Sequence, residues 1–228
     1  MKRSASERTF TLMSVSRHTL SVSCLLALAL PFAAAMFSAP AANALDSARL
    51  QSILPLMREA APTADYGAIV DFTIHSSKER FHLVRMSDGE IVFNARVAHG
   101  EGSDKNDDGL VDAFSNKKET QASSVGLFLT GDSYDGKHGP SLYLHGKSNT
   151  NKQAFDRNIV LHDDESYVSS QYVHKYGKVG RSCGCFVLTP QDRERTMRLL
   201  SLGSPVYAFG AAGVPVDDDL PVLPCPSP

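Results

Sequence analysis

From residue 69 onward, hydrophobic and polar positions alternate with a period of two, which is typical of β-strands with one buried face. The alternation is clear at 81–83 and at 91–97, on either side of Ser87-Asp88-Gly89. Because Asp-Gly between two such runs is a strong turn signal, we expect a β-hairpin there. Further strands are expected at residues 69–74, 125–130, 142–145, 158–162, 186–188 and 206–209. The pattern predicts a mainly β protein, either a β-sandwich or a curved mixed sheet, with a few short helices.

Two helices interrupt or precede this pattern. Residues 46–59 place their large apolar side chains on one helical face behind Asp46, a good N-cap residue, and Pro55 is expected to bend or end the helix. A second helix is expected after Thr189-Pro190, which offers a hydroxyl cap followed by proline at the first helical position. Gly203 is expected to end that helix.

The first 44 residues have the three parts of an export signal. They combine a basic start, an uncharged apolar run at 19–37 and the small residues Ala42-Asn43-Ala44. We expect cleavage after Ala44 and localisation in the periplasm or cell envelope. The alternative is an uncleaved anchor, since 19 apolar positions approach the length of a membrane span, but Pro31 and the small-residue end argue against it. We expect no stable membrane insertion once the signal is removed.

The remaining chain is expected to have three parts. They are an N-terminal helical segment at 45–65, a β-rich domain at 66–210 and a tail rich in Pro and Asp at 211–228. The 228 residues are 42% hydrophobic and 21% charged with a formal net charge of −2, which is typical of a globular protein. No basic stripe is present, so we expect no nucleic-acid partner, and we expect a monomer.

Three cysteines follow the predicted signal: Cys183, Cys185 and Cys225. An odd number in an exported protein leaves at least one thiol free, reactive or paired with another molecule. A disulfide between Cys183 and Cys185 would close a very tight ring across a single residue. Cys225 lies in the tail and is not expected to be catalytic.

Cys185 has the surroundings that a nucleophilic cysteine needs. A thiolate requires a base or a cation nearby, and backbone amides must receive the developing oxyanion. His162 ends an apolar strand and is the candidate base, while Arg181 and Gly184 lie in the loop before the cysteine. The first alternative is that Cys185 is a small buried hydrophobic residue and His162 a structural one. The second is a zinc site, for which ligands one residue apart are poorly spaced; its candidate ligands are Cys183, Cys185, His162 and His145.

Seven short motifs in order carry a resemblance to a known family. They are Val97-Ala98-His99-Gly100-Glu101-Gly102-Ser103, Phe114-Ser115-Asn116, Ser123-Ser124-Val125-Gly126, Tyr134-Asp135-Gly136-Lys137-His138-Gly139, Asn158 to His162, Tyr167-Val168-Ser169 and Gly180-Arg181-Ser182-Cys183-Gly184-Cys185. Together they resemble the murein L,D-transpeptidase catalytic domain family, a YkuD-like group. The resemblance covers about residues 66 to 210.

The resemblance implies a YkuD-like β fold in which a thiolate attacks the bond between diaminopimelate and D-alanine in a peptidoglycan stem peptide. It assigns Cys185 as the nucleophile and His162 as the base. Cys183 stands where better-known relatives have the His of a Ser-His-Gly-Cys motif. Two further departures are Phe186, where Pro is common, and Asp163, where Gly is common. Neither removes a reacting atom, but both change the surroundings of the site.

The resemblance also implies the remaining parts of the site. A second stem's amine would resolve the acyl-enzyme into a 3-3 crosslink, and water would instead make the protein an L,D-carboxypeptidase. No cofactor or metal is expected. The expected oxyanion loop consists of Ser182, Cys183 and Gly184. The residues expected to border the substrate are Arg181, which would bind a carboxylate, with His145, Tyr143 and His138. His99 and His138 both lie in glycine-rich stretches of the matched motifs that could border the cleft, and a structural hydrogen-bonding role is favoured over that alternative for both.

Two other classes of function remain open from the sequence. One is a peptidoglycan-binding module without turnover, and the other is a thiol redox protein. The segment 104–112 also has the spacing of a calcium loop, although Ser115 stands where a bidentate acid is expected. The alternative for that segment is a polar turn.

Overall fold

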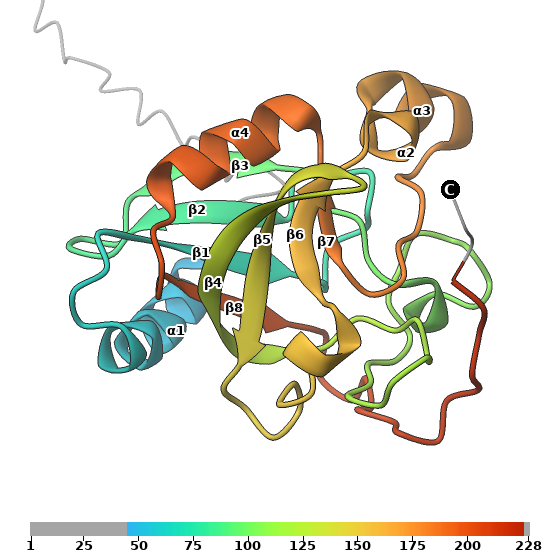
Figure 1. Ribbon diagram of the computed structural model, residues 1–228, viewed down its shortest axis with the longest axis horizontal. Coiled ribbons are helices and arrows are strands. Elements are labelled where there is room, and N and C mark those ends of the chain that lie inside the picture. Colours follow the sequence, from blue (N-terminus) through green and yellow to red (C-terminus); the bar gives the residue numbers. More distant parts are fainter. Residues whose placement is uncertain (1–44, 226–228) are drawn as a thin grey trace, which may run out of the picture. The chain divides into compact units, whose positions relative to one another are not determined.

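Residues 45–225, the part of the chain that the computed structural model describes, contain eight strands in one mixed sheet (Figure 1). The strands are β1 (Tyr66–Asp71), β2 (Phe81–Arg85), β3 (Ile91–Ala95), β4 (Gly126–Gly136), β5 (Gly139–Gly146), β6 (Val160–Asp163), β7 (Phe186–Leu188) and β8 (Pro205–Phe209). Their order in the sheet is β3-β2-β1-β8-β4-β5-β6-β7. The predicted fold class is confirmed in the form of a mixed sheet. The predicted export signal lies outside the described residues.

Four α-helices and two short 3-10 helices lie among the described residues. They are α1 (Ser47–Ala60), α2 (Glu165–Val168), α3 (Ser170–Tyr176) and α4 (Pro190–Leu199), with η1 (Glu101–Ser103) and η2 (Phe155–Arg157). Both predicted caps are present, because Asp46 accepts from the amides of Ala48 and Arg49 and Thr189 accepts from the amide of Asp192. Helices α2 and α3 were not predicted. None of the helices in 45–225 is long and apolar enough to cross a bilayer.

The prediction that Pro55 ends the first helix is wrong, since α1 continues to Ala60, and a bend at Pro55 stays a prediction. Pro55 is exposed, while Ile53, Leu54 and Met57 are buried against the sheet. This burial outweighs the one backbone hydrogen bond that proline removes. The second helix ends at Leu199, before Gly203, which instead adopts a left-handed conformation in the following turn.

The two hairpins of the sheet differ in how well their sequence predicts them. At Asp88-Gly89, β2 and β3 pair antiparallel and Gly89 has φ of +80°, as the Asp-Gly signal predicts. In contrast, β4 and β5 continue well past the predicted ends, until Gly136 faces Gly139. Polar residues line this extension, so it lacks the alternation that marks a strand. The hairpin curls over β6 and β7 and carries Lys137 and His138 at its tip (Figure 1).

The last described residues, 211–225, form an extended segment rather than a helix or a sheet strand. This tail runs along the loop at 113–122, where the Phe114 amide donates to Pro215 and the Leu223 amide to Glu119. Leu220 is its buried anchor and packs against that loop. The tail thus lies extended, as expected, but it is fixed to the β-rich domain.

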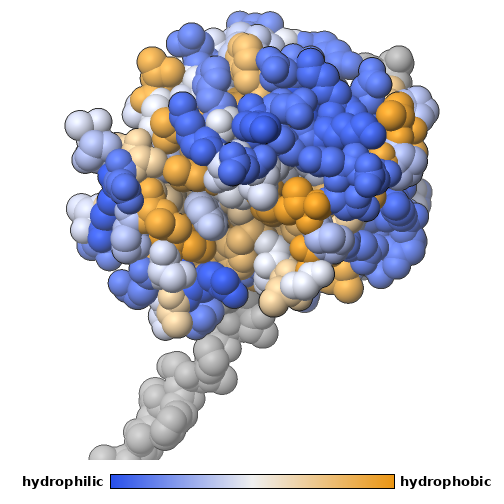
Figure 2. Space-filling view, turned by 90° about the horizontal axis from the view of Figure 1, so that it is seen from below, coloured by the Kyte–Doolittle hydropathy of each residue, from blue (hydrophilic) through white to orange (hydrophobic). Residues whose placement is uncertain are grey.

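Large hydrophobic side chains that remain exposed are spread over separate elements of the described chain. They are Leu56, Leu110, Phe155, Tyr176, Leu202, Val216 and Val222. Figure 2 shows one face, on which hydrophilic residues gather at the upper right and smaller apolar areas lie across the middle. This distribution defines no single apolar docking surface.

Candidate active site

His162 lies in β6, and Cys185 directly precedes β7, the parallel neighbour of β6; both lie on the same face of the sheet. In the register of β6 and β7, Leu161 is opposite Phe186 and His162 is opposite Val187. Leu161 and Phe186 both enter the main core. Because side chains alternate along a strand, His162 and Cys185 project to the other face, where Cys185 packs near Val187. The geometry therefore brings the predicted base and nucleophile to one side of one strand pair.

The His162 imidazole is held in one orientation. Its Nδ1 lies 3.0 Å from the carbonyl oxygen of Asp163, and its ring stacks on that of His138 with the centroids 4.5 Å apart. A carbonyl can only accept, so Nδ1 carries the proton in the neutral ring and Nε2 has the free lone pair. Burial, and secondarily the adjacent His138, lowers the pKa of His162. The ring is thus neutral near pH 7 and suited to accept a proton.

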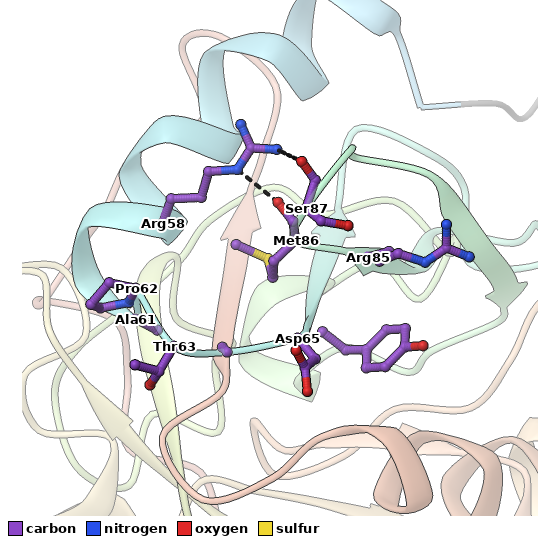
Figure 3. A pocket seen from close by; sticks show the side chains of 10 residues that line it. Arg58, Ala61, Pro62, Thr63, Asp65, Arg85, Met86 and Ser87 are labelled. Carbon is purple, nitrogen blue, oxygen red and sulfur yellow. Dashed lines mark hydrogen bonds between the residues drawn. The ribbon is translucent and has the colours of Figure 1, made fainter.

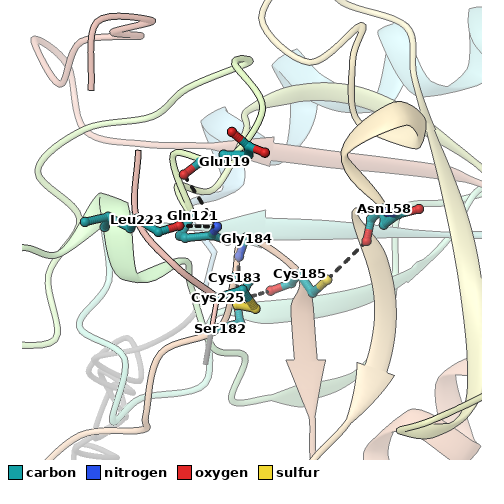
Figure 4. The surroundings of a disulfide bond; sticks show 9 residues. All are labelled: Glu119, Gln121, Asn158, Ser182, Cys183, Gly184, Cys185, Leu223 and Cys225. Carbon is teal, nitrogen blue, oxygen red and sulfur yellow. Dashed lines mark hydrogen bonds between the residues drawn. A yellow bond between two sulfur atoms is a disulfide. The ribbon is translucent and has the colours of Figure 1, made fainter. Parts of the chain in front are cut away.

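Cys185 is the free cysteine of the described residues, and it is half-buried. Its Sγ lies 3.5 Å from the carbonyl oxygen of Asn158 (Figure 4). Burial raises the pKa of this thiol, while the Val160 amide and the positive charges of Arg157 and Lys137 oppose that rise. The resting sulfur is therefore a thiol that needs a base to become nucleophilic.

Hydrogen bonds fix the loop before Cys185. The Ser182 hydroxyl donates to the carbonyl of Cys185 at 2.8 Å and accepts from the Gly184 amide at 3.1 Å. Gly184 has φ of +109°, and a Cβ there would lie 2.8 Å from the carbonyl oxygen of Ala122. Only glycine fits this conformation and this space. The predicted loop residues thus form a rigid turn in front of the nucleophile.

The second sulfur of this loop, Cys183, is bonded to Cys225 of the tail, with the Cα atoms 5.7 Å apart (Figure 4). The disulfide removes Cys183 from the alternative set of zinc ligands. Within residues 45–225, no group of three or more His, Cys, Asp and Glu side chains is placed to hold a metal ion. The odd cysteine left by this pairing is Cys185.

Arg181, the predicted carboxylate ligand, is held by protein groups. Its guanidinium donates to the carbonyl of Asp104 and forms ion pairs with Asp107 at 3.2 Å and Glu101 at 3.5 Å. Two of these partners, Asp104 and Asp107, belong to the segment 104–112 that has the spacing of a calcium loop. A substrate carboxylate would have to compete with these partners, so substrate binding by Arg181 stays a prediction.

The calcium-like segment forms a polar turn in this structure. The Asp104 carboxylate accepts from the amides of Asp108 and Gly109 and lies 3.0 Å from His99 Nε2. Burial is the main cause that lowers the pKa of His99 to about 4, so its ring is neutral. Its Nδ1 lies 2.7 Å from a guanidinium nitrogen of Arg80, and since arginine only donates, Nδ1 accepts and Nε2 donates to Asp104. His99 therefore has the expected structural hydrogen-bonding role.

Tyr143 and His145 lie on the same face as Cys185. Strand β5 is next to β6, and Tyr143 is opposite Val160, two positions before His162. Their partners are aromatic: Tyr143 stacks on Tyr134 at 4.3 Å, and His145 stacks on Phe155 at 4.7 Å. The sequence analysis identified Tyr143, His145 and His138 but missed Tyr134 and Phe155 as parts of this wall. The pairing of β4 with β5 reveals Tyr134, and the ring contacts of η2 with β5 reveal Phe155.

Arg157 was also missed, although it directly precedes the motif that contains His162. It belongs to η2, a short polar turn that carries no chemical signature in the sequence. Its nearness to Cys185 arises because the following strand pairs with β7. A motif search centred on strand residues does not reach it.

A hollow of about 580 Å³ lies away from these residues, between the end of α1 and β2 (Figure 3). Its Arg58 donates to the carbonyls of Met86 and Ser87, and its Arg85 forms ion pairs with Asp88 and Glu90. Both arginines of this hollow are thus bonded within the protein. It contains no cysteine or histidine that would support the chemistry described above.

His138→Ala is expected to raise the pKa of His162 by about half a unit. The substitution removes a nearby imidazole and uncovers the ring, and both changes favour the protonated form. Titration of the His162 resonances by NMR measures the shift. His75→Ala, at a histidine bonded to Ser77 and Asp108, is the matched control and should leave the His162 titration unchanged. A His162 titration that moves to lower pH, or does not move, would contradict the expectation.

Comparison with known proteins identifies the family to which the chain belongs. The family model for the L,D-transpeptidase catalytic domain matches residues 43–209. The chain therefore belongs to the L,D-transpeptidase catalytic domain family. None of the curated proteins matches it.

Two similar solved structures are L,D-transpeptidases. One, from Stackebrandtia nassauensis, is 17% identical with a TM-score of 0.39, and the match covers 66% of this chain and 58% of that chain. The other, from Mycobacterium smegmatis, is 13% identical with a TM-score of 0.39, covering 64% and 59%. The match thus spans less than two thirds of either structure's own length.

Proposed function

We propose that this protein is a cysteine acyltransferase of the cell envelope that acts on peptidoglycan stem peptides. The observation that carries the proposal is that His162 in β6 and Cys185 just before the adjacent β7 lie on one face of the sheet, in a chain of the L,D-transpeptidase family. The export signal predicted from the sequence supports a location in the periplasm or cell envelope, where peptidoglycan is found. The bond cleaved is the one between the L-centre of diaminopimelate and D-alanine.

The first half-reaction forms a thioester. His162 Nε2 takes the proton from Cys185, and the thiolate adds to the carbonyl carbon of diaminopimelate. The Gly184 amide already donates to Ser182, so we assign the developing oxyanion to the neighbouring Cys185 amide. As the tetrahedral intermediate collapses, the bond to D-alanine breaks, and His162 returns the proton to the leaving amine.

The second half-reaction releases the acyl group. A side-chain amine of a second stem attacks the thioester carbonyl, loses a proton to His162 and forms a crosslink between two diaminopimelates. The Cys185 sulfur leaves and recovers the proton. Attack by water in place of the amine gives a free tripeptide, which is the L,D-carboxypeptidase outcome.

The aromatic wall beside Cys185 supports a peptide substrate. Tyr143 and His145 lie on the face of the sheet that carries the sulfur, and both stack on other rings. Stacking fixes the positions of the Tyr143 hydroxyl and of the His145 ring nitrogens, which suit hydrogen bonds to the amides and carboxylates of a stem peptide. We assign substrate contacts to Tyr143, His145 and His138.

Incubation with a disaccharide-tetrapeptide tests the proposal. The expected results are release of D-alanine, a mass increase on the protein equal to the disaccharide-tripeptide acyl group, and localisation of that adduct to the peptide containing Cys185. Accumulation of dimers indicates transfer to an amine, and accumulation of tripeptide indicates hydrolysis. Undiminished binding to peptidoglycan without any adduct or product would instead identify a binding module.

A further inference from the structure

Arg157 has a guanidinium that is anchored by uncharged groups. It donates to the carbonyls of Ser115 and Ala122 and to the hydroxyl of Ser124, each at 2.6 Å. Within the described residues, it forms no ion pair with a carboxylate at 4.0 Å or less. Its charge is therefore held in place without being neutralised by a direct partner.

This charge lies beside the nucleophile's loop. A Cβ on Gly184 would be 3.4 Å from Arg157 Nη2, and the carbonyl of the next residue, Asn158, is the partner of the Cys185 sulfur. Burial lowers the pKa of Arg157 to about 10, so the side chain stays charged at neutral pH. A fixed cation near a half-buried sulfur stabilises its ionised form.

Other ionisable groups also face the sulfur, and they differ in kind. Lys137 reaches it from the hairpin tip, and the phenols of Tyr134 and Tyr167 interact with it from β4 and α2. His162 lies on the adjacent strand. Of the two cations, Lys137 belongs to a hairpin tip, whereas Arg157 is fixed by three hydrogen bonds.

One carboxylate faces Arg157 from the tail. Asp218 interacts electrostatically with the guanidinium, while its own Oδ1 accepts from the hydroxyl of Ser115 and the amide of Asn116. It therefore reduces the effect of the Arg157 charge without being bonded to it. The net charge around the Cys185 sulfur can therefore be lowered by a substitution of Arg157 or raised by a substitution of Asp218.

We propose that Arg157 is a positioning residue whose guanidinium, fixed beside the loop of Cys185, stabilises the thiolate form of that residue. The ionisation transfers the Cys185 proton to His162 or to solvent and leaves the sulfur with the electron pair. Arg157 contacts neither the substrate nor the leaving group in this role. The consequence for catalysis rests on the proposed function, but the effect on the thiol does not.

The test is the pH dependence of Cys185 alkylation by iodoacetamide, measured on the full chain by mass analysis of the peptide that contains Cys185. Arg157→Gln removes the charge and is expected to move the midpoint of the alkylation rate up by about one pH unit. Arg157→Lys keeps a charge and is expected to stay near the wild type. Asp218→Asn removes the opposing carboxylate and is expected to move the midpoint down.

Arg58→Gln is the matched control, because Arg58 also donates to two carbonyls but lies at α1. It should leave the midpoint unchanged. The proposal is overturned if Arg157→Gln titrates like the wild type, if Arg157→Lys shifts as far as Arg157→Gln, or if Arg58→Gln shifts equally. Should Arg157→Gln fail to fold, Asp218→Asn decides, and an unchanged or raised midpoint overturns the proposal. Absence of D-alanine release by the wild type would refute the proposed function separately, since alkylation needs no substrate.

Discussion

Cys185→Ala is expected to lower D-alanine release from a tetrapeptide stem by at least about a thousandfold. Cys185 is the free thiol of residues 45–225, so the substitution removes the sulfur that would form the thioester. Chromatography and mass spectrometry of the muropeptide products measure the loss. The melting temperature should change little, because the side chain is small and only half-buried.

Cys225→Ser provides the matched control for this loss. It also removes one sulfur near the site, but from the tail side of the disulfide. It is expected to retain a large part of the activity at temperatures below its own unfolding transition. If both variants lost activity equally while folded, a shared redox or metal role of the cysteines would replace the nucleophile assignment.

The double variant Cys183→Ser/Cys225→Ser is expected to be less stable than the wild type by about 4 kcal/mol. The bond joins positions separated by 42 residues, so its loss frees a large closed loop in the unfolded chain. For a domain of this size, the change corresponds to a melting temperature lower by roughly 10 °C. Calorimetry or thermal melting followed by circular dichroism measures it.

Wild-type protein treated with a reductant is the control for that prediction. Reduction breaks the same bond without changing the sequence, so the reduced wild type should melt near the double variant. The double variant itself should not respond to the reductant. A wild-type melting temperature that is insensitive to reduction would show that the bond contributes little to stability.

The sequence predicts the fold where local signals and packing agree. The Asp-Gly turn at 88–89, the cap at Asp46 and the cap at Thr189 each specify a conformation through their own hydrogen bonds or backbone preference, and all are present. The expectation that the first helix ends at Pro55 failed because the cost of proline inside a helix was outweighed by burial of the helix face that carries Ile53 and Leu54. Local preference and tertiary packing oppose each other there, and only the structure shows which is larger.

The candidate site could likewise be predicted only in part from local patterns in the sequence. Cys185 and His162 can be identified from their motifs, but their common face depends on the register between β6 and β7. The partner of Cys183 is a residue of the distant tail, and cysteine count alone does not specify connectivity. Arg157 illustrates the remaining limit, because its three anchors lie 33 to 42 residues earlier in the chain. Long-range pairing creates these contacts, and no local pattern records them.

Strand β8 has a further consequence through its place in the middle of the sheet. It pairs with β1 on one side and β4 on the other, so it is the link between the ribbon β3-β2-β1 and the ribbon β4-β5-β6-β7. Until residues 205–209 have been synthesised, the chain holds two incomplete ribbons. A premature stop before Pro205 would therefore leave the edges of β1 and β4 unpaired and prone to aggregation.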